Sequence, residues 1–596
     1  METLWSMSTT IREAERIPDF IKTAKEIDGQ EWTKEIQEKF QILLIKNRQY
    51  LNSGKIQDFN KLSDEQIMIL KDKSRLMTYE EAASIFYSKD YESPDMRGRQ
   101  SMSPLVKLGL VDKSSGYIRL TDSGWKLAND EISLEQFMFD SLLKMQYPNP
   151  IESEHANWNT KPFINTLRLI KRVNNICKEK GIKEKGITKL EFGIFALSLK
   201  SYNDIEKVAN KIVEFRNEYE SFNEYADKEN YARNYINEYL YNFKNPVKNV
   251  KEYTDNIIRY MRITKYIYIR GAFGNTCIDL EPRRMVEINS LLENDEGISK
   301  GYTEKEWVEY FGKYGSYKLP FETTDKLIEI LNNIQKDINQ LESKLGIELT
   351  NIKHANEIKE IKDQISKQRE YRTRLQNLEI KFDYKNDIST INEAIDSLKN
   401  IRKLPLKPSI ALEKWVNIAL NIINDSKLIK PNSIVGDDNE PTFTAPAGVP
   451  DIECYYDSFN ATCEVTMLSG RDQWYNEGQP IMRHLREFEE LNKDKPAYCL
   501  FIAPSLHEDS IETFFTSVKH GYKGRVQKIV PITISQLIDI LKIVEKMKAK
   551  GKLLKHKDLM RLFNRCISLD ECGFDSTLWL PHIKNEIFSW EKEMLA

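Results

Sequence analysis

The sequence contains no apolar run of about 18 residues, which excludes an ordinary transmembrane helix. Its N-terminal segment has no cationic stretch followed by an apolar one, so we expect no secretion signal and no membrane attachment. The seven cysteines are scattered without a CxxC pair. This argues against zinc ribbons and a disulfide framework, and favours a reducing, cytoplasmic location.

The chain has no large net charge of either sign, and its formal net charge of −3 neither supports nor excludes a nucleic-acid partner. The composition, 40% hydrophobic and 30% charged, is that of an ordinary globular protein. A chain of 596 residues has room for roughly three to five domains.

The most informative stretch, residues 451–465, reads DIECYYDSFNATCEV. Its alternation and its central turn cluster at 457–460 predict a β-hairpin. The hairpin would place Asp451, at the start of one strand, beside Glu464 on the next. Two carboxylates held in this way suit a hard divalent cation, and Mg²⁺ with phosphate is the usual occupant of such sites. Similar residues also occur by chance on edge strands.

The surrounding segments predict an α/β domain with a central mixed sheet. We expect an amphipathic helix over Ile410–Ile423, then a loop of about 25 residues up to Gly448, which is long enough to indicate a functional role. After the hairpin, a helix should begin at Gln479–Pro480, because proline suits the first helical position. Strands are expected over 497–502 and 528–533, with a further helix from Ser535.

Residues 76–130 predict a winged helix-turn-helix. The expected order is a helix capped by Thr78, a second helix within Arg97–Val111, a two-stranded wing around Ser114–Gly116, and a helix after Leu120. Winged helices also serve as protein–protein modules. In the DNA-binding interpretation, base and phosphate contacts would come from Arg97, Arg99, Gln100, Ser101, Ser103, Lys107 and Arg119.

Residues 160–190 carry a surplus of seven positive charges, which is typical of phosphate binding although such runs are often only solvated. A second winged-helix-like unit is expected over residues 186–290. Its wing would consist of 266–270, a turn at 271–275 and 276–280. Tyr266, Tyr268 and Arg270 are candidates for DNA contact there, although an aromatic stripe is more often part of a core.

Residues 321–400 predict long helices with a heptad seam at Leu327, Leu331, Ile334, Ile338, Leu341 and Leu345. We expect an antiparallel helical pair that separates two globular halves. An intermolecular coiled coil is the alternative.

Pro450-Asp451 and Glu464-Val465 resemble the core of PD-(D/E)xK nucleases, except that Thr466 stands where that superfamily usually has lysine. The longer stretch AGVPDIECYYDSFNATCEVT, with Glu477 and Met482-Arg483-His484-Leu485, resembles the AlwI-type family of type IIS restriction endonucleases, which includes BstNBI-like strand-specific nicking enzymes. LVDKSSGYIRLTDSGWKLAND, Met145–Pro148 and Cys499–Pro504 are also similar to that family.

The resemblance implies a Mg²⁺-dependent type II site-specific deoxyribonuclease. Such an enzyme binds a short asymmetric double-stranded DNA site and hydrolyses a phosphodiester a few base pairs away, leaving 5′-phosphate and 3′-hydroxyl ends. Asp451, Glu464 and the Val465 carbonyl would hold the metal. Glu477 and His484 would complete the catalytic set, with Glu413 as a further acidic candidate.

The predicted organisation is therefore multidomain. A mainly helical DNA-recognition half comprises winged-helix subdomains at 1–155 and 156–295, a helical linker follows at 296–400, and a PD-(D/E)xK-like cleavage domain at 401–596. Double-strand cleavage would require a transient homodimer or a second nuclease subunit, and a separate methyltransferase would protect the host. Two alternatives are a non-catalytic DNA-binding regulator with a degenerate nuclease domain and a structural helical protein. The sequence does not give the recognition site or the cut distance.

Overall fold

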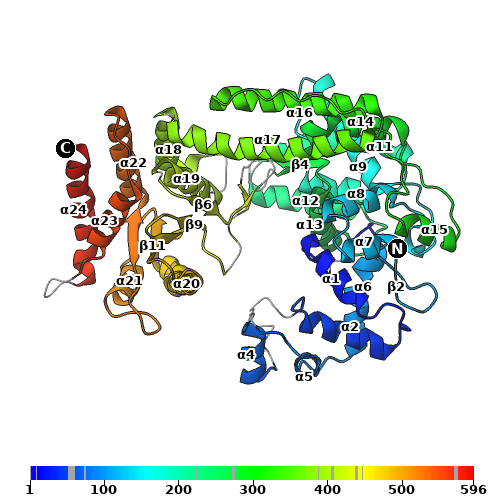
Figure 1. The fold of residues 1–596 in the computed structure, drawn as a ribbon, viewed down its shortest axis with the longest axis horizontal. Helices are drawn as coiled ribbons and strands as arrows, with labels where there is room; N and C mark the ends of the chain where they lie inside the picture. The colour runs from blue at the N-terminus through cyan, green and yellow to red at the C-terminus, as the bar shows by residue number, and fades with distance from the viewer. Residues whose placement is uncertain are drawn as a thin grey trace. The chain divides into compact units, whose positions relative to one another are not determined.

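The computed structural model describes residues 2–7, 10–50, 59, 61–72, 75–222, 224–270, 276–386, 388–404, 408–423, 425–435, 441–443, 445, 448–569 and 575–596. The chain forms two compact units, one of residues 1–269, 277–330 and 356–358, the other of 270–276, 331–355 and 359–596 (Figure 1). Most of the described chain is helical, and a mixed sheet lies near the C-terminus. No helix in these ranges is long and apolar enough to cross a membrane.

The first part of the N-terminal unit has the order of elements that the sequence predicts. Thr78 and Glu81 form a capping box that starts α5, as expected. A short antiparallel pair, β1 with β2, then separates α6 from α7. The elements are α1 (Ile17–Lys25), α2 (Lys34–Lys46), α4 (Asp64–Lys71), α5 (Tyr79–Ser88), α6 (Pro94–Lys107), β1 (Val111–Asp112), β2 (Arg119–Leu120), α7 (Asp122–Ala128) and α8 (Leu134–Lys144).

Helix α6 packs directly on α2, and Gly98 makes this approach possible. A Cβ atom at position 98 would lie 1.9 Å from the carbonyl oxygen of Gln37. The face of α6 that carries Gly98, Met102 and Leu105 is therefore buried, while Arg99 and Gln100 on the other side are exposed.

The second part of the unit contains a three-stranded sheet in the order β3-β5-β4. The predicted wing strands are present as β4 and β5, and the turn expected at 271–275 lies outside the described residues. Tyr266 is buried and stacks on Phe139 at 4.1 Å, so its expected exposure to DNA is wrong. The elements are α9 (Pro162–Glu179), β3 (Ile187–Thr188), α10 (Lys189–Glu191) with a π-helical turn (Phe192–Ala196), α11 (Ile205–Ser221), α12 (Tyr225–Tyr239), α13 (Pro246–Ile263), β4 (Ile267–Arg270), β5 (Cys277–Leu280), α14 (Met285–Asn294) and α15 (Glu304–Gly312).

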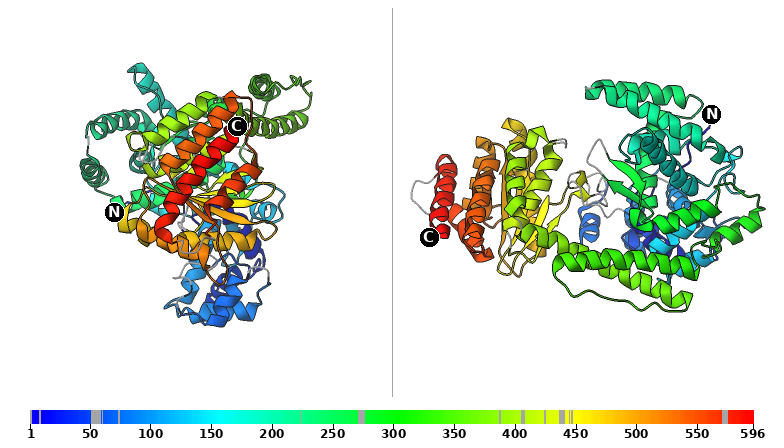
Figure 2. Two further views of the ribbon diagram at one scale, coloured as in Figure 1. Left: turned by 90° about the vertical axis from the view of Figure 1, so that its left-hand side faces the viewer. Right: turned by 90° about the horizontal axis from the view of Figure 1, so that it is seen from above.

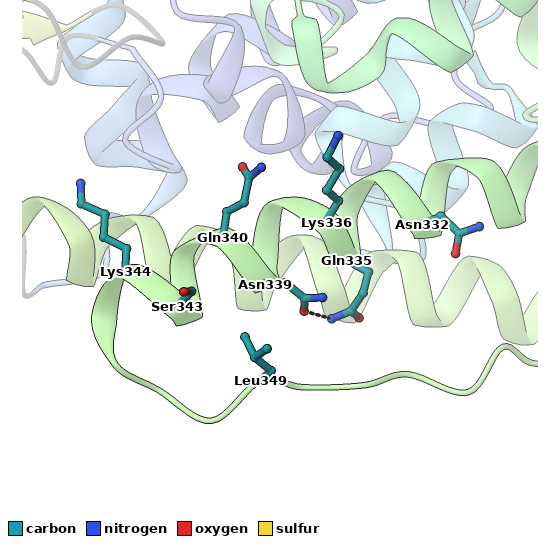
Figure 3. Close-up of a pocket in the computed structure, with 8 residues that line it drawn as sticks. All are labelled: Asn332, Gln335, Lys336, Asn339, Gln340, Ser343, Lys344 and Leu349. Atoms are coloured by element: carbon teal, nitrogen blue, oxygen red, sulfur yellow. Dashed lines mark hydrogen bonds between the residues drawn. The ribbon is translucent and has the colours of Figure 1, made fainter.

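Helices α16 (Thr324–Leu345) and α17 (Ile358–Asn386) run side by side (Figures 1 and 2). The residues that join them return along α16 instead of reversing at its end (Figure 3). The Gln335 side chain donates to the Thr350 carbonyl at 2.5 Å, and Gln364 donates to the Lys353 carbonyl at 2.9 Å. Helix α17 therefore runs in the same direction as α16, and the predicted antiparallel pairing is wrong.

A buried carboxylate explains why the connector follows this path. Glu342 on α16 is fully buried, and a buried charge requires hydrogen-bond donors. The Thr350 amide donates to it at 2.8 Å, and the Tyr371 hydroxyl donates at 2.9 Å. The returning connector borders an open polar groove of about 740 Å³, lined by Asn332, Gln335, Lys336, Asn339, Gln340, Ser343, Lys344 and Leu349 (Figure 3).

The C-terminal sheet has the order β12-β11-β10-β9-β6, and it is mixed as predicted. Strands β10, β11 and β12 are parallel, whereas β9 is antiparallel to both β6 and β10. Helices α20 and α21 pack together against it, as do α19 and α22, and α18 packs on α19 and α22. The elements are α18 (Ile388–Lys399), α19 (Pro408–Ile423), β6 (Leu428–Pro431), β7 (Ile434–Val435), β8 (Pro441–Phe443), β9 (Ile452–Tyr455), β10 (Asn460–Val465), α20 (Gly470–Leu491), β11 (Ala497–Ala503), α21 (Glu508–Lys519), β12 (Ile529–Thr533), α22 (Ile534–Ala549), α23 (His556–Cys566) and α24 (Ser576–Leu595).

Two local predictions for this domain are wrong. Helix α20 begins at Gly470, so Pro480 lies inside it and only one backbone bond is lost there. The expected 25-residue loop contains strands β6, β7 and β8, and parts of it lie outside the described residues. The helix predicted over Ile410–Ile423 is present as α19, which is buried on most sides because it packs against both the sheet and α22.

We expect Gly98→Ala to lower the free energy of unfolding of the N-terminal unit by about 1–3 kcal/mol, because the added methyl group overpacks the α2–α6 contact. Urea denaturation followed by circular dichroism measures this change. Gly301→Ala is the control, since nothing lies within 4 Å of its Cβ position. Equal midpoints for the two variants would contradict the close packing of α6.

Candidate active site

The β9–β10 hairpin brings the two predicted carboxylates together at one edge of the sheet. Ile452 pairs with Cys463, so Asp451 lies opposite Glu464 in the next position of the register. The Val465 amide donates to Asp451 Oδ2 at 2.8 Å. Glu464 is only 5% exposed. The hairpin and the juxtaposition of its carboxylates are as the sequence predicts.

His484 on α20 contacts Glu464. Its Nδ1 lies 2.9 Å from Glu464 Oε1, while its Nε2 is enclosed and has no hydrogen-bond partner among the described residues. Burial and the neighbouring Arg483 charge lower the pKa of His484. A neutral ring in this position orients the Glu464 carboxylate.

Glu477 lies on the same helix as His484, seven residues before it. Burial raises the pKa of Glu477. Thr466 stands directly after β10, and its hydroxyl accepts a hydrogen bond from the Leu468 amide at 3.1 Å. The position where the sequence resemblance leads us to expect lysine therefore carries no positive charge.

Glu413 reaches the same place from α19. It is 5% exposed, and its Oε2 accepts a hydrogen bond from the Ala445 amide at 3.2 Å. Burial, and then the charges of Asp451 and Glu464, raise the pKa of Glu413 to about 8. This coupling shows that Glu413 belongs to the same electrostatic cluster as the hairpin carboxylates.

Burial and mutual repulsion dominate the cluster. The pKa of Asp451 is raised well above its ordinary value by burial and by Glu464, and that of Glu464 by burial and by Glu477. These acids need a cation to be ionised together. Among the described residues, no group of three or more His, Cys, Asp or Glu side chains is placed to hold a metal ion. Two neighbouring carboxylates still suit Mg²⁺, which is often bound through only one or two carboxylates and typically keeps several of its water ligands.

A further acid on β9, Glu453, is excluded from this cluster. It lies two residues after Asp451 on the same face of the strand, yet its pKa is lowered because bonds from Tyr455, Asn432 and Lys430 outweigh its burial. Lys430 Nζ lies 3.1 Å from Glu453 Oε1. The negative charge of Glu453 is thus already balanced by Lys430, so Glu453 is not a ligand candidate.

The part played by Asn432 was not predicted from the sequence. Its side-chain amide donates to the Pro450 carbonyl and to Glu453 Oε1, both at 2.9 Å. An isolated polar residue after a short strand gives no sequence signal, and this one falls within the segment that we expected to be a loop.

The residues of α6 and β2 that were predicted to contact DNA are of two kinds: some are exposed, and others are buried or already paired within the protein. Ser101 is 1% exposed and donates to Gln41 at 2.8 Å, so it faces the protein core and the expected contact with DNA is not supported. Lys107 is partly buried and pairs with Glu152 at 3.3 Å. The others lie nearer the surface: Arg97 over the Tyr91 ring at 4.7 Å, Arg99 beside Asp95 at 3.0 Å, and Gln100 and Arg119 exposed.

The basic stretch at 160–190 is largely compensated by partners elsewhere in the N-terminal unit. Lys161 pairs with Asp295 at 2.7 Å and is 4% exposed. Arg172 pairs with Glu206 at 2.6 Å. Lys185 pairs with Glu220 and Lys189 with Asp255. Part of the surplus charge in the sequence is therefore compensated within the unit, while Lys178, Lys180 and Lys183 are exposed.

Comparisons with known proteins give a family match. The profile of the AlwI restriction endonuclease family matches residues 106–540, a range that includes all five predicted catalytic residues. No curated protein matches the sequence. Among solved structures, the small subunit of the heterodimeric restriction endonuclease R.BspD6I is similar at 23% identity over 33% of this chain and 98% of that chain, with a TM-score of 0.29.

We expect Glu413→Gln to stabilise the protein at alkaline pH when divalent cations are removed by EDTA. Because the folded-state pKa of about 8 exceeds the ordinary 4.5, the folded chain binds this proton more tightly than the unfolded chain. The stabilisation of the fold by this bound proton is complete below pH 4.5 and is lost as the pH rises through 8. Thermal unfolding at pH 6 and pH 9 measures the difference.

Glu453→Gln is the matched control, because the pKa of Glu453 is lowered. That carboxylate stabilises the fold above its ordinary pKa, so its replacement should destabilise the protein at pH 9. A Glu413 variant that follows the wild-type melting temperature at both pH values would place Glu413 outside the cluster.

Proposed function

This chain belongs to the AlwI restriction endonuclease family, and on that basis we propose that it is a type IIS or strand-nicking endonuclease. It would bind a short asymmetric DNA site and hydrolyse a phosphodiester a few base pairs away, leaving 5′-phosphate and 3′-hydroxyl ends. The observation that carries this proposal is the buried, mutually repelling set of Asp451, Glu464, Glu477 and Glu413 at one sheet edge.

Asp451, Glu464 and the Val465 carbonyl would hold Mg²⁺, which is the cation that suits two carboxylates and a phosphate oxygen. When bound, the metal would supply Lewis-acid stabilisation of the charge that develops on the phosphate. Its charge would also allow the repelling carboxylates to ionise together.

The residues around these ligands have separate tasks. The neutral His484 donates from Nδ1 to Glu464 and fixes the orientation of that carboxylate. Glu477, whose pKa is raised by burial, is suited to hold the attacking water and accept its proton. Glu413 can take up a proton when the site is empty.

The N-terminal unit would recognise DNA as a winged helix. In support, α6 packs on α2 through one face and leaves Arg99 and Gln100 exposed on the other, and the β1–β2 wing follows directly. Residues near Glu31 extend this wing, since Glu31 bridges to Tyr117. Side chains on an exposed helix can reach base edges in the major groove.

A single active site cuts one strand. A chain acting alone would therefore nick DNA, and a double-strand break would require a transient homodimer or a separate nuclease subunit. A restriction function also implies a separate methyltransferase that protects host DNA. The alternative is a DNA-binding regulator with a degenerate nuclease domain, and the intact carboxylate set argues against such decay.

The decisive test is incubation of the purified protein with supercoiled plasmid and Mg²⁺. We expect open-circular or linear products with fixed ends from the wild type. Asp451→Ala and EDTA should each reduce the rate of cleavage by at least about a hundredfold, because a metal ligand is lost or the metal is removed. A Glu453→Gln control should keep most of the activity, since Glu453 is already neutralised.

Undiminished cutting by Asp451→Ala would refute the proposed active site. If the wild type binds the plasmid and never cuts it, the regulator becomes the better interpretation.

For recognition, we expect Arg99→Ala or Gln100→Ala to weaken specific DNA binding roughly tenfold, as the loss of one base contact typically does. Gel-shift titrations at fixed salt measure the affinity. Arg259→Ala is a closely matched control, because Arg259 is 46% exposed and pairs with Asp255 at 3.0 Å, whereas Arg99 is 50% exposed and pairs with Asp95 at 3.0 Å. Equal losses in the Arg99 and Arg259 variants would argue against a recognition role for α6.

A further inference from the structure

Asn432 lies directly after strand β6, where the last ladder pair joins Pro431 to Ile452. Its backbone amide donates to the Asp451 carbonyl at 2.9 Å. Its side-chain amide donates to the Pro450 carbonyl and to Glu453 Oε1, each at 2.9 Å. A side-chain NH₂ has two hydrogens, so these two bonds use its full donor capacity.

The consequence is that Asp451 is held from two sides. Asn432 fixes the carbonyls of Pro450 and Asp451, and the Val465 amide fixes the Asp451 carboxylate at 2.8 Å. Pro450 has no N–H group, so its backbone cannot donate a hydrogen bond to a neighbouring strand. Metal ligands must be held within about 0.5 Å of their productive geometry, and bonds from neighbouring groups usually achieve this.

The same side chain separates the two acids of β9. Glu453 lies on the face that carries Asp451, and an acid there would compete for any cation at the site. Asn432 and Lys430 both bond Glu453 Oε1, and the Tyr455 hydroxyl bonds Oε2. Glu453 is therefore turned towards β6 and away from Glu464.

We propose that Asn432 is a positioning residue for the metal ligand Asp451, and that it also keeps Glu453 out of the metal site. This inference rests on the proposed function, because it takes Asp451 to be a metal ligand. It assigns a task to a residue outside the proposed set of metal ligands.

Asn432→Ala tests the inference, with Mn²⁺ binding to the DNA-free protein measured by isothermal titration calorimetry. We expect the dissociation constant to rise tenfold or more, as is typical when a group that supports a metal ligand is removed. The Mg²⁺ concentration for half-maximal cleavage should rise by a similar factor, while cleavage at saturating Mg²⁺ recovers towards the wild-type rate. DNA affinity in EDTA should be unchanged.

Asn492→Ala is the control for loss of an asparagine side-chain bond in the same unit, since Asn492 is half-buried and donates to the Phe488 carbonyl at 2.9 Å. It should bind Mn²⁺ as the wild type does. Glu453→Gln keeps an acceptor for Asn432 and should also retain Mn²⁺ affinity. If Asn432→Ala does not fold, Asn432→Asp replaces the donor by an acceptor at constant size and should show the same loss.

The outcomes separate the inference from the proposed function. A variant with a lower melting temperature and unchanged Mn²⁺ affinity would make Asn432 merely structural and overturn the inference. Loss of Mn²⁺ affinity in the Glu453→Gln variant would show that Glu453 is a ligand, and this too would overturn the inference. If the wild type neither binds Mn²⁺ nor cuts DNA, the proposed function itself fails, and the inference fails with it.

Discussion

The C-terminal unit is built around acids that repel one another. Strands β9 and β10 bring Asp451 and Glu464 together, α19 adds Glu413 and α20 adds Glu477, so that negative charge converges from both sides of one sheet. Burying such groups without a counter-charge is costly. The fold can tolerate this because a large apolar core stabilises the unit and because protons can neutralise the acids when no cation is bound.

The polar groups near the acids act in two different ways. Some contact a single acid: the Val465 amide bonds Asp451, and His484 bonds Glu464. Lys430 instead neutralises an acid that would otherwise compete. Opposite pKa shifts on Asp451 and Glu453, two residues apart on one strand, show how strongly local hydrogen bonding decides the chemistry of a carboxylate.

Local patterns in the sequence predicted local structure well. Alternation predicted the β9–β10 hairpin, the apolar run at 497–502 predicted the buried strand β11, and Thr78 with Glu81 predicted the start of α5. These features depend on neighbours in the chain.

Several of the errors came from distant contacts. The direction of α17 depends on bonds between the connector and α16, and the inward orientation of Ser101 depends on Gln41. The basic stretch looked like a binding surface because its acidic partners lie up to 134 positions away, as Asp295 does from Lys161. The predicted catalytic residues come together in the structure, although their roles remain predictions.

The returning connector links the lengths of neighbouring segments. Helix α16 has 22 residues and spans about 33 Å, and the connector, residues 346–357, reaches about 40 Å when extended. Seven residues added to α16 alone would lengthen the helix by about 10 Å, to more than the extended connector can span. Insertions and deletions in this region should therefore be inherited in compensating pairs, and helix length and connector length should change together among natural relatives.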